Sequence, residues 1–224
     1  AGIELKKRYG DDKVCDFSLG NPDLTPPPAI VNAMRDLTAQ VARPAGLGYM
    51  PNAGYADVRA GLAAYLAKEQ QTPLQASHVV LTCGAAGGIN AFFRAVLTPG
   101  EEVLCPAPYF VEYGFYAGNF GGVLRPVPSE PDGFHLDLDG FARAITEKTR
   151  VVIINSPNNP SGVIYTEDEL RRLAAILDRA TARYGRPIFL ISDEPYRFLA
   201  FDGAVVPPML PLYTYTVVIG SFSK

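Results

Sequence analysis

The sequence has few of the residues that build disulfide frameworks or metal sites. It contains three cysteines and two histidines in 224 residues. Cys15, Cys83 and Cys105 are odd in number and lack C-x-x-C spacing, so we expect reduced, mostly buried thiols. His78 and His135 have no acid or cysteine at ligand spacing, and we therefore expect no metal site.

Long apolar runs and an excess of positive charge are also missing. Twenty Lys and Arg stand against 23 Asp and Glu, and no basic run is long enough to follow a phosphate backbone, so we expect no nucleic-acid partner. No apolar stretch approaches the roughly 20 residues that span a membrane, and the charged residues 1–8 lack the apolar core of a signal peptide. These absences predict no membrane association and a cytoplasmic location.

The composition that is present indicates a folded α/β protein. Hydrophobic residues make up 48% and charged residues 19%, which excludes a disordered chain and is enough for one sizeable core or two modest ones. From residue 77 onward, short runs that are apolar at every position alternate with longer helical segments, which is typical of a parallel sheet covered on both faces. The predicted strands are Val79–Thr82, Glu102–Cys105, Val123–Val127, Val151–Ile154, Ile188–Ile191 and Thr216–Gly220.

Helix signals accompany these strands. Thr166 and Glu169 form a capping box before an amphipathic segment that should end at Gly185. Further helices are predicted over 87–97 and 55–68. The proline-rich residues 1–51 are predicted to be mostly extended, with one short helix over 29–38.

Ligands of an open parallel sheet collect beyond the carboxyl ends of its strands, so the residues after each run are the candidate site. The small residues 83–88 lead into a helix whose free N–H groups would attract a phosphate, although a purely structural tight turn explains them equally well. They match neither the dinucleotide fingerprint nor the P-loop.

Two other strands end in polar groups. Residues 155–162 carry three asparagines, more amides than a simple surface turn needs. Asp193 and Glu194 end a buried strand, where a carboxylate requires a cation or a donor, so we expect Asp193 to face a charged partner; a helix-capping role is the alternative.

The last predicted strand leads to Ser221-Phe222-Ser223-Lys224. A lysine at a strand end can act as a Schiff-base nucleophile, whereas a lysine at a chain end is usually just solvated. An anion site, neutral amides, a carboxylate and a lysine are together the parts that hold pyridoxal phosphate and use it as an electron sink.

The ordered set of motifs resembles the class I/II aminotransferases, the aspartate aminotransferase-like branch of the fold-type I pyridoxal-phosphate enzymes. The resemblance implies a three-layer α/β/α large domain with a mostly parallel sheet. The motifs that carry it are Gly20-Asn21-Pro22, Tyr49-Met50-Pro51-Asn52-Ala53-Gly54, Gly84-Ala85-Ala86, Pro108-Tyr109, Asn158-Asn159-Pro160-Ser161-Gly162, Asp193-Glu194-Pro195-Tyr196 and Ser221-Phe222-Ser223-Lys224.

The resemblance implies a role for each matching position. Lys224 would hold the cofactor as a Schiff base and shuttle the proton, and Asp193 would keep the pyridine nitrogen protonated. Asn159 and Tyr196 would hydrogen-bond the cofactor O3′, with Tyr196 counted among the catalytic residues and Asn159 also facing the substrate. The remaining implied contacts are Tyr109 on the ring; Gly84, Ala85, Ala86, Ser221 and Ser223 on the phosphate; Tyr49 on the phosphate of a partner subunit; and Gly20 on the substrate carboxylate.

The implied enzyme is a homodimer that transfers an amino group between an amino acid and a 2-oxo acid by a ping-pong mechanism. Residues 1–50 are expected to form an extended segment and the start of an arm and small-domain region, and residues 51–224 the cofactor-binding large domain. Family members are nearly twice as long, so we expect a truncated large domain that lacks an antiparallel strand between its first and last strands. A carbon–sulfur β-lyase of the same fold, or a non-catalytic binding module, are the alternatives.

Overall fold

The computed structural model describes residues 2–15, 24–44 and 46–223, and it divides the chain into two compact units, Ala1–Tyr49 and Met50–Lys224, which are described separately. The first unit contains α1 (Gly2–Tyr9), the 3₁₀ turn η1 (Asp11–Lys13) and α2 (Pro28–Val41). Helix α2 was predicted from the sequence, but α1 was not. Its signal is charge: Glu4 lies in the first turn and three basic residues lie in the last, as the helix dipole favours.

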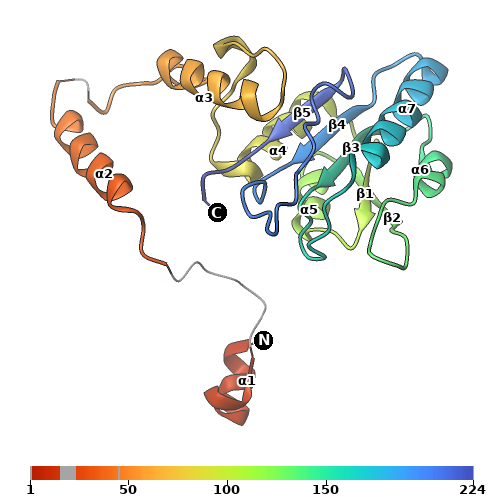
Figure 1. The fold of residues 1–224 in the computed structure, drawn as a ribbon, viewed down its shortest axis with the longest axis horizontal. Coiled ribbons are helices and arrows are strands. Elements are labelled where there is room, and N and C mark those ends of the chain that lie inside the picture. The colour runs from red at the N-terminus through yellow and green to blue at the C-terminus, as the bar shows by residue number, and fades with distance from the viewer. Residues whose placement is uncertain (1, 16–23, 45, 224) are drawn as a thin grey trace. The chain divides into compact units, whose positions relative to one another are not determined.

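The second unit is built on a parallel sheet (Figure 1). Its described residues form five strands in the order β2-β1-β3-β4-β5, and every neighbouring pair is parallel. The α/β class predicted from the sequence is confirmed. The elements in chain order are α3 (Ala56–Glu69), η2 (Ala76–His78), α4 (Gly84–Val96), β1 (Glu102–Ala107), α5 (Glu112–Gly118), β2 (Val123–Pro128), α6 (Leu138–Ala144), β3 (Thr149–Asn155), α7 (Glu167–Tyr184), β4 (Phe189–Asp193) and β5 (Thr216–Ile219).

Helices cover the sheet on both faces and make it the middle of three layers. Alternate side chains of the central strands point to opposite faces, so Val151 and Ile153 pack toward α4 and α5, whereas Val152 and Ile154 pack toward α6 and α7. All four are at most 1% exposed. Burial on both faces explains why these strands read as unbroken apolar runs rather than as alternating ones.

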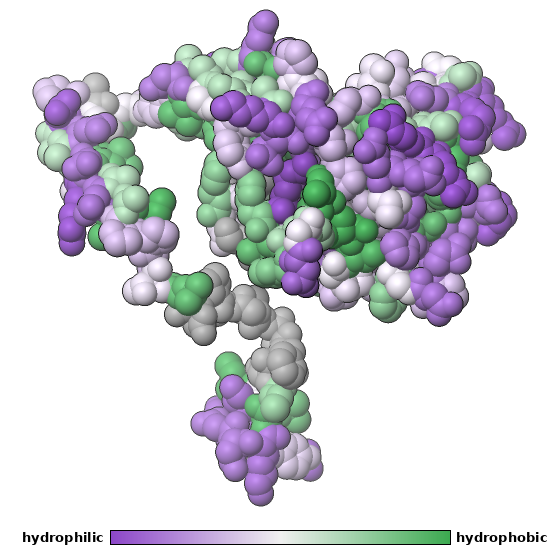
Figure 2. All heavy atoms as spheres, in the orientation of Figure 1, coloured by the Kyte–Doolittle hydropathy of each residue, from purple (hydrophilic) through white to green (hydrophobic). Residues whose placement is uncertain are grey.

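Helix α7 follows its sequence signals closely. The Thr166 hydroxyl accepts a hydrogen bond from the Glu169 backbone N–H, and the Glu169 carboxylate accepts one from the Thr166 backbone N–H, which completes the capping box. The helix ends at Gly185, whose φ of 66° is a left-handed conformation that glycine adopts without strain. Its apolar face lies in the core, and hydrophilic residues cover its outer side (Figure 2).

The prediction of a strand over Val79–Thr82 is wrong. Val79 is extended, but residues 79–82 form no sheet ladder, and Leu81 N bonds instead to Ala53 O at 3.0 Å. A strand is stable only when a neighbour accepts its hydrogen bonds, and no described residue forms a strand beside this run. The resemblance places an antiparallel strand in that position.

The prediction that the cysteine thiols are mostly buried is confirmed for one residue of three. Cys105 is buried on β1, whereas Cys15 and Cys83 are exposed. Cys83 is the residue directly before α4, and it lies on the surface there and not in the core. Within the described ranges, no helix combines the length and the apolar character that spanning a membrane requires.

Candidate active site

Asp193 ends β4 and is the centre of the candidate site. The side chain is 5% exposed, and its Oδ2 accepts a hydrogen bond of 2.5 Å from the Tyr113 hydroxyl. Its Oδ1 is buried and has no hydrogen-bond partner among the described residues. Burial raises the pKa of Asp193 from 3.8 to about 6; the nearby Glu194 adds to the rise and the Tyr113 hydrogen bond opposes it. The site therefore contains a buried carboxylate oxygen that no described residue meets with a hydrogen-bond donor.

The neighbouring carboxylate, Glu194, is fully partnered. It receives hydrogen bonds from Arg197 at 2.9 Å, Ser192 at 2.7 Å and Gln70 at 2.8 Å. Burial raises its pKa, and Arg197 opposes the rise. Arg197 thus pairs with Glu194, and the hydrogen-bond partner of the Asp193 side chain among the described residues is the neutral hydroxyl of Tyr113. No helix begins at Asp193, so the helix-capping alternative is wrong.

The asparagine-rich loop after β3 is tied to the end of β4. In the sheet, Asn155 lies opposite Asp193, and its Nδ2 donates to the Asp193 carbonyl at 2.8 Å. Its Oδ1 accepts from Asn159 N at 2.6 Å. Asn159 Nδ2 in turn donates to the Tyr196 hydroxyl at 3.2 Å. One buried amide therefore places Asn159 and Asp193 relative to each other.

The third asparagine of this loop has a structural role. Asn158 is 6% exposed, and its Oδ1 accepts from the Ser161 backbone N–H at 3.1 Å and hydroxyl at 2.8 Å. These bonds close the turn, as an asparagine in an ordinary loop does. Of the three amides, Asn155 and Asn158 shape the loop, and Asn159 directs its side chain toward Tyr196.

The glycine-rich first turns of α4 lie beside the end of β5. A Cβ at Gly88 would be 3.3 Å from both Ile219 Cγ2 and Thr82 Oγ1, so the absence of a side chain allows α4 to approach the last residue of β5. Thr82 Oγ1 donates to the Gly84 carbonyl at 2.9 Å. The backbone N–H groups of Ala85 and Ala86 belong to the first helical turn, which has no acceptor within the helix. They form a potential anion site.

Ser221 and Ser223 follow β5, at the carboxyl edge of the sheet where Asp193 also lies. Their hydroxyls are 2.7 Å apart, and Ser223 N donates to Ser221 Oγ at 3.2 Å. Since Asp193 lies opposite Ile219 in the sheet, these serines come directly after the strand that neighbours Asp193. Two hydroxyls and a helix N-terminus thus lie at one edge of the sheet.

Two predicted site residues that the structure describes, Tyr109 and Tyr49, take no part in these hydrogen bonds. Tyr109 follows β1 and packs, half-buried, against the cluster beneath α4 and α5. Tyr49 belongs to the first unit and is fully exposed. Gly20 and Lys224 lie outside the described residues.

The residue that the sequence analysis missed is Tyr113. It lies in the first turn of α5, four residues beyond Tyr109, and is 1% exposed. Its weak signal was a tyrosine in the segment after β1, where carboxyl-edge residues are expected. Asn155 was recognised only as one amide among three, because its bond to the Asp193 carbonyl joins two strands 38 positions apart in the sequence.

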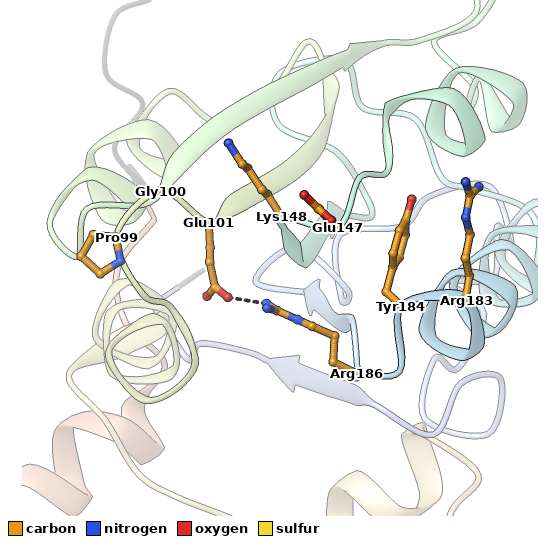
Figure 3. Close-up of a pocket in the computed structure, with 8 residues that line it drawn as sticks. All are labelled: Pro99, Gly100, Glu101, Glu147, Lys148, Arg183, Tyr184 and Arg186. Atoms are coloured by element: carbon orange, nitrogen blue, oxygen red, sulfur yellow. Dashed lines mark hydrogen bonds and ion pairs between the residues drawn. The ribbon is translucent and has the colours of Figure 1, made fainter.

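A cavity of about 710 Å³ opens at the opposite, amino edge of the sheet (Figure 3). Glu101 pairs with Arg186 there, and neither belongs to the candidate site. In the part of the chain that the structure describes, no cluster of His, Cys, Asp and Glu is arranged to bind a metal. The cavity lining includes Glu101, Glu147, Lys148, Arg183, Tyr184 and Arg186.

This fold is found in solved aminotransferase structures. The structure superposes on an amino transferase from Eubacterium rectale with a TM-score of 0.92 and 36% identity, covering 100% of this chain and 56% of that one. It superposes on the Thermus thermophilus aspartate aminotransferase crystallised with maleate with a TM-score of 0.85 and 30% identity, covering 100% and 56%. The class of protein is therefore an aminotransferase-like α/β fold.

Sequence comparison defines the family. The model of aminotransferase class I and II matches residues 12–224. The Aquifex aeolicus protein named probable aspartate/prephenate aminotransferase is 34% identical over 99% of this chain, which spans 54% of that relative. The chain belongs to the class I and II aminotransferase family, and it covers about half the length of the relatives that it matches.

Proposed function

We propose that the protein is a pyridoxal-phosphate-dependent aminotransferase that transfers an amino group between an amino acid and a 2-oxo acid by a ping-pong mechanism. The observation that carries the proposal is Asp193 Oδ1, a buried carboxylate oxygen without a described partner at the carboxyl edge of the sheet. Relatives across the family carry aminotransferase names, which favours transfer of the amino group over the lyase alternative.

The Asp193 carboxylate suits the ring nitrogen of this cofactor. A buried, unpaired carboxylate is unfavourable until a cationic or N–H donor meets it, and a pyridinium N–H supplies both features. When bound, pyridoxal phosphate supplies an electron sink for the charge that develops at the substrate α-carbon. Asp193 would hold the proton on the ring nitrogen and so maintain that capacity.

Other residues of the site would orient the cofactor. Asn159 and Tyr196, which already contact each other, would bind its O3′ oxygen. Tyr109 would lie against the ring, because aromatic faces stack. The phosphate would bind at the start of α4, where free N–H groups and the helix dipole favour an anion. The phosphate-binding residues would be Gly84, Ala85, Ala86, Ser221 and Ser223.

Lys224 would supply the reactive amine. It follows Ser223 directly in the sequence and matches the family lysine. Its amine would attach the cofactor and then take the proton from the substrate α-carbon. Residues 51–224 would thus be the cofactor-binding domain.

The substrates and the assembly are parts of the same proposal. Gly20 would lie by the substrate carboxylate, Asn159 would contact the substrate, and Tyr49 would reach the cofactor phosphate in the partner subunit of a homodimer. The complete exposure of Tyr49 within its own unit is compatible with a partner for its side chain. The cytoplasmic location and the homodimer stay predictions.

Chemical trapping tests the proposal. Borohydride reduction of the cofactor-loaded protein, followed by peptide mapping, is expected to place the pyridoxyl group on Lys224. Lys148, exposed at the amino-edge cavity, is the internal control and should remain unlabelled. Labelling of Lys148 or Lys68 in place of Lys224 would refute the assignment, and a protein that takes up no pyridoxal phosphate would refute the proposed cofactor.

A further inference from the structure

Among the described residues, one hydrogen bond joins α5 to the Asp193 carboxylate, and the Tyr113 hydroxyl donates it. The two residues are 80 positions apart, and both are buried, at 1% and 5% exposure. The hydroxyl donates to Oδ2 and leaves Oδ1 without a partner. The two oxygens of one carboxylate are therefore in different states, although the proposed chemistry requires only one of them.

We propose that Tyr113 is a positioning residue, which binds Asp193 Oδ2 and so presents Oδ1 alone to the N–H of a bound pyridine ring. The inference rests on the proposed function. A carboxylate on one strand end can rotate about its side-chain torsions, and a donor fixed on a packed helix removes that freedom. Tyr113 is fixed in this way, since its ring packs edge-to-face on Phe110 with centroids 5.6 Å apart.

The charge state of the pair agrees with this role. Burial, and next the Asp193 charge, raises the pKa of the Tyr113 hydroxyl, so the phenol remains a neutral donor at physiological pH. A neutral donor stabilises the carboxylate without cancelling its charge, which remains available to the ring nitrogen. Among the described residues, the titratable groups around the Tyr113–Asp193 pair are Cys105 on β1, Tyr116 on α5, and Glu194 and Tyr196 after β4.

Tyr116 provides a matched control. It lies on the same helix, is 8% exposed, and its hydroxyl donates to Glu112 instead of Asp193. Tyr113→Phe and Tyr116→Phe each remove one hydrogen-bonded hydroxyl from α5. A merely structural role predicts that both substitutions have similar consequences, whereas the positioning role predicts that they differ at Asp193.

The experiment measures two quantities on the wild type and both variants. The first is the titration of the Asp193 carboxyl carbon by ¹³C NMR on the cofactor-free protein, with Asp193→Asn to assign the signal. We expect Tyr113→Phe to move the midpoint upward by about one pH unit or more, because a hydrogen bond to the charged form is lost. Tyr116→Phe should leave it unchanged. The second is the dissociation constant of pyridoxal phosphate, which we expect to rise about tenfold in Tyr113→Phe and less than twofold in Tyr116→Phe.

The outcomes separate the inference from the function on which it rests. A wild type that does not bind pyridoxal phosphate overturns the proposed function, and the Tyr113 assignment with it. Normal cofactor binding by the wild type with an unmoved Asp193 midpoint in Tyr113→Phe overturns the Tyr113 assignment alone. A moved midpoint with unchanged affinity also overturns it, since Oδ1 would then be presented without help from Tyr113.

Discussion

At the amino edge of the sheet, Glu102 meets Arg125 at 2.7 Å and the Thr146 hydroxyl at 2.7 Å, whereas at the carboxyl edge Asp193 meets a single tyrosine hydroxyl among the described residues. Burial alone would raise the pKa of Glu102, but the hydrogen bonds from Thr146 and Arg125 outweigh it and the pKa is lowered. The pKa of Asp193 is raised. Two buried carboxylates of one sheet are thus perturbed in opposite directions.

The difference separates a carboxylate that is fully hydrogen-bonded by described neighbours from one that is not. Glu102 has its partners within the chain, so its charge supports folding. One oxygen of Asp193 has no partner among the described residues, which lowers stability, as is common for ionisable groups in functional sites. The pH dependence follows from the signs. The charge of Glu102 raises the free energy of unfolding above pH 4.5, and this contribution is lost as the pH falls through its lowered pKa. The buried charge of Asp193 lowers the free energy of unfolding above about pH 6, and this effect disappears by about pH 4.

The largest expected effect is on catalysis at the carboxyl edge. Asp193→Ala is expected to slow the half-reaction with an amino acid by at least about a thousandfold, or roughly 4 kcal/mol in the barrier, because the ring nitrogen loses its counter-charge. Glu101→Ala at the amino edge should change the rate by less than about threefold. Stopped-flow absorbance of the bound cofactor measures both. A near-normal rate in Asp193→Ala would show that the half-reaction does not depend on the Asp193 carboxylate.

The second-largest effect is expected when the charge of Asp193 is removed, and it concerns the stability of the cofactor-free protein. Asp193→Asn removes the buried charge, so it should increase the free energy of unfolding by about 1–3 kcal/mol at pH 8. The gain should shrink below pH 6 and vanish near pH 4, where the native carboxyl is already protonated. Urea unfolding at several pH values measures this. A variant that is less stable than the wild type at pH 8 would contradict the argument.

Glu102→Gln should change the free energy of unfolding in the opposite direction. The neutral amide loses the charge-assisted bond to Arg125, and we expect a loss of about 1–2 kcal/mol in the free energy of unfolding at pH 7. Cofactor affinity should not change, because Glu102 lies at the far end of its strand. The same urea titrations report the stability, and the loss should decrease below about pH 4. Equal losses at both pH values would mean that the charge of Glu102 is not what matters.

The smallest effect is expected at the rim of the amino-edge cavity. Lys148 is exposed, and Lys148→Ala should change the free energy of unfolding by less than about 0.5 kcal/mol and leave cofactor binding unaltered. Thermal unfolding with and without pyridoxal phosphate measures both. A clear loss of cofactor binding would place function at this edge and would overturn the distinction between the two edges.

The fold was largely predictable because its signals are local or repeated. The runs that became β3 and β4 are apolar at every position, and the run that became β1 is apolar after Glu102. These three strands begin and end within two residues of the predicted limits. The capping box of α7 needs only Thr166 and Glu169. The run at 79–82 has the same composition and is not a strand, because a strand also needs a neighbour that local sequence does not reveal.

The candidate site was predictable only in part, for the same reason. Short motifs after each strand indicated Asp193, Asn159 and the start of α4, and the order of those motifs indicated the family. The partners of these residues were not indicated. A tyrosine on α5 and an asparagine on β3 look like ordinary residues until the fold brings Tyr113 and Asn155 to the end of β4.

The sequence by itself determined the alternation of buried strands and helices, and the edge of the sheet at which polar residues gather, since both depend on patterns within one segment. Only the tertiary structure decided which carboxylate pairs with Arg197 and which has an oxygen without a partner among the described residues. Arg197 is three residues from Glu194 and four from Asp193, and either pairing agrees with that spacing. The contacts of Glu194 with Gln70 and of Asp193 with Tyr113 made the choice, because hydrogen bonds between distant segments form only once those segments pack together.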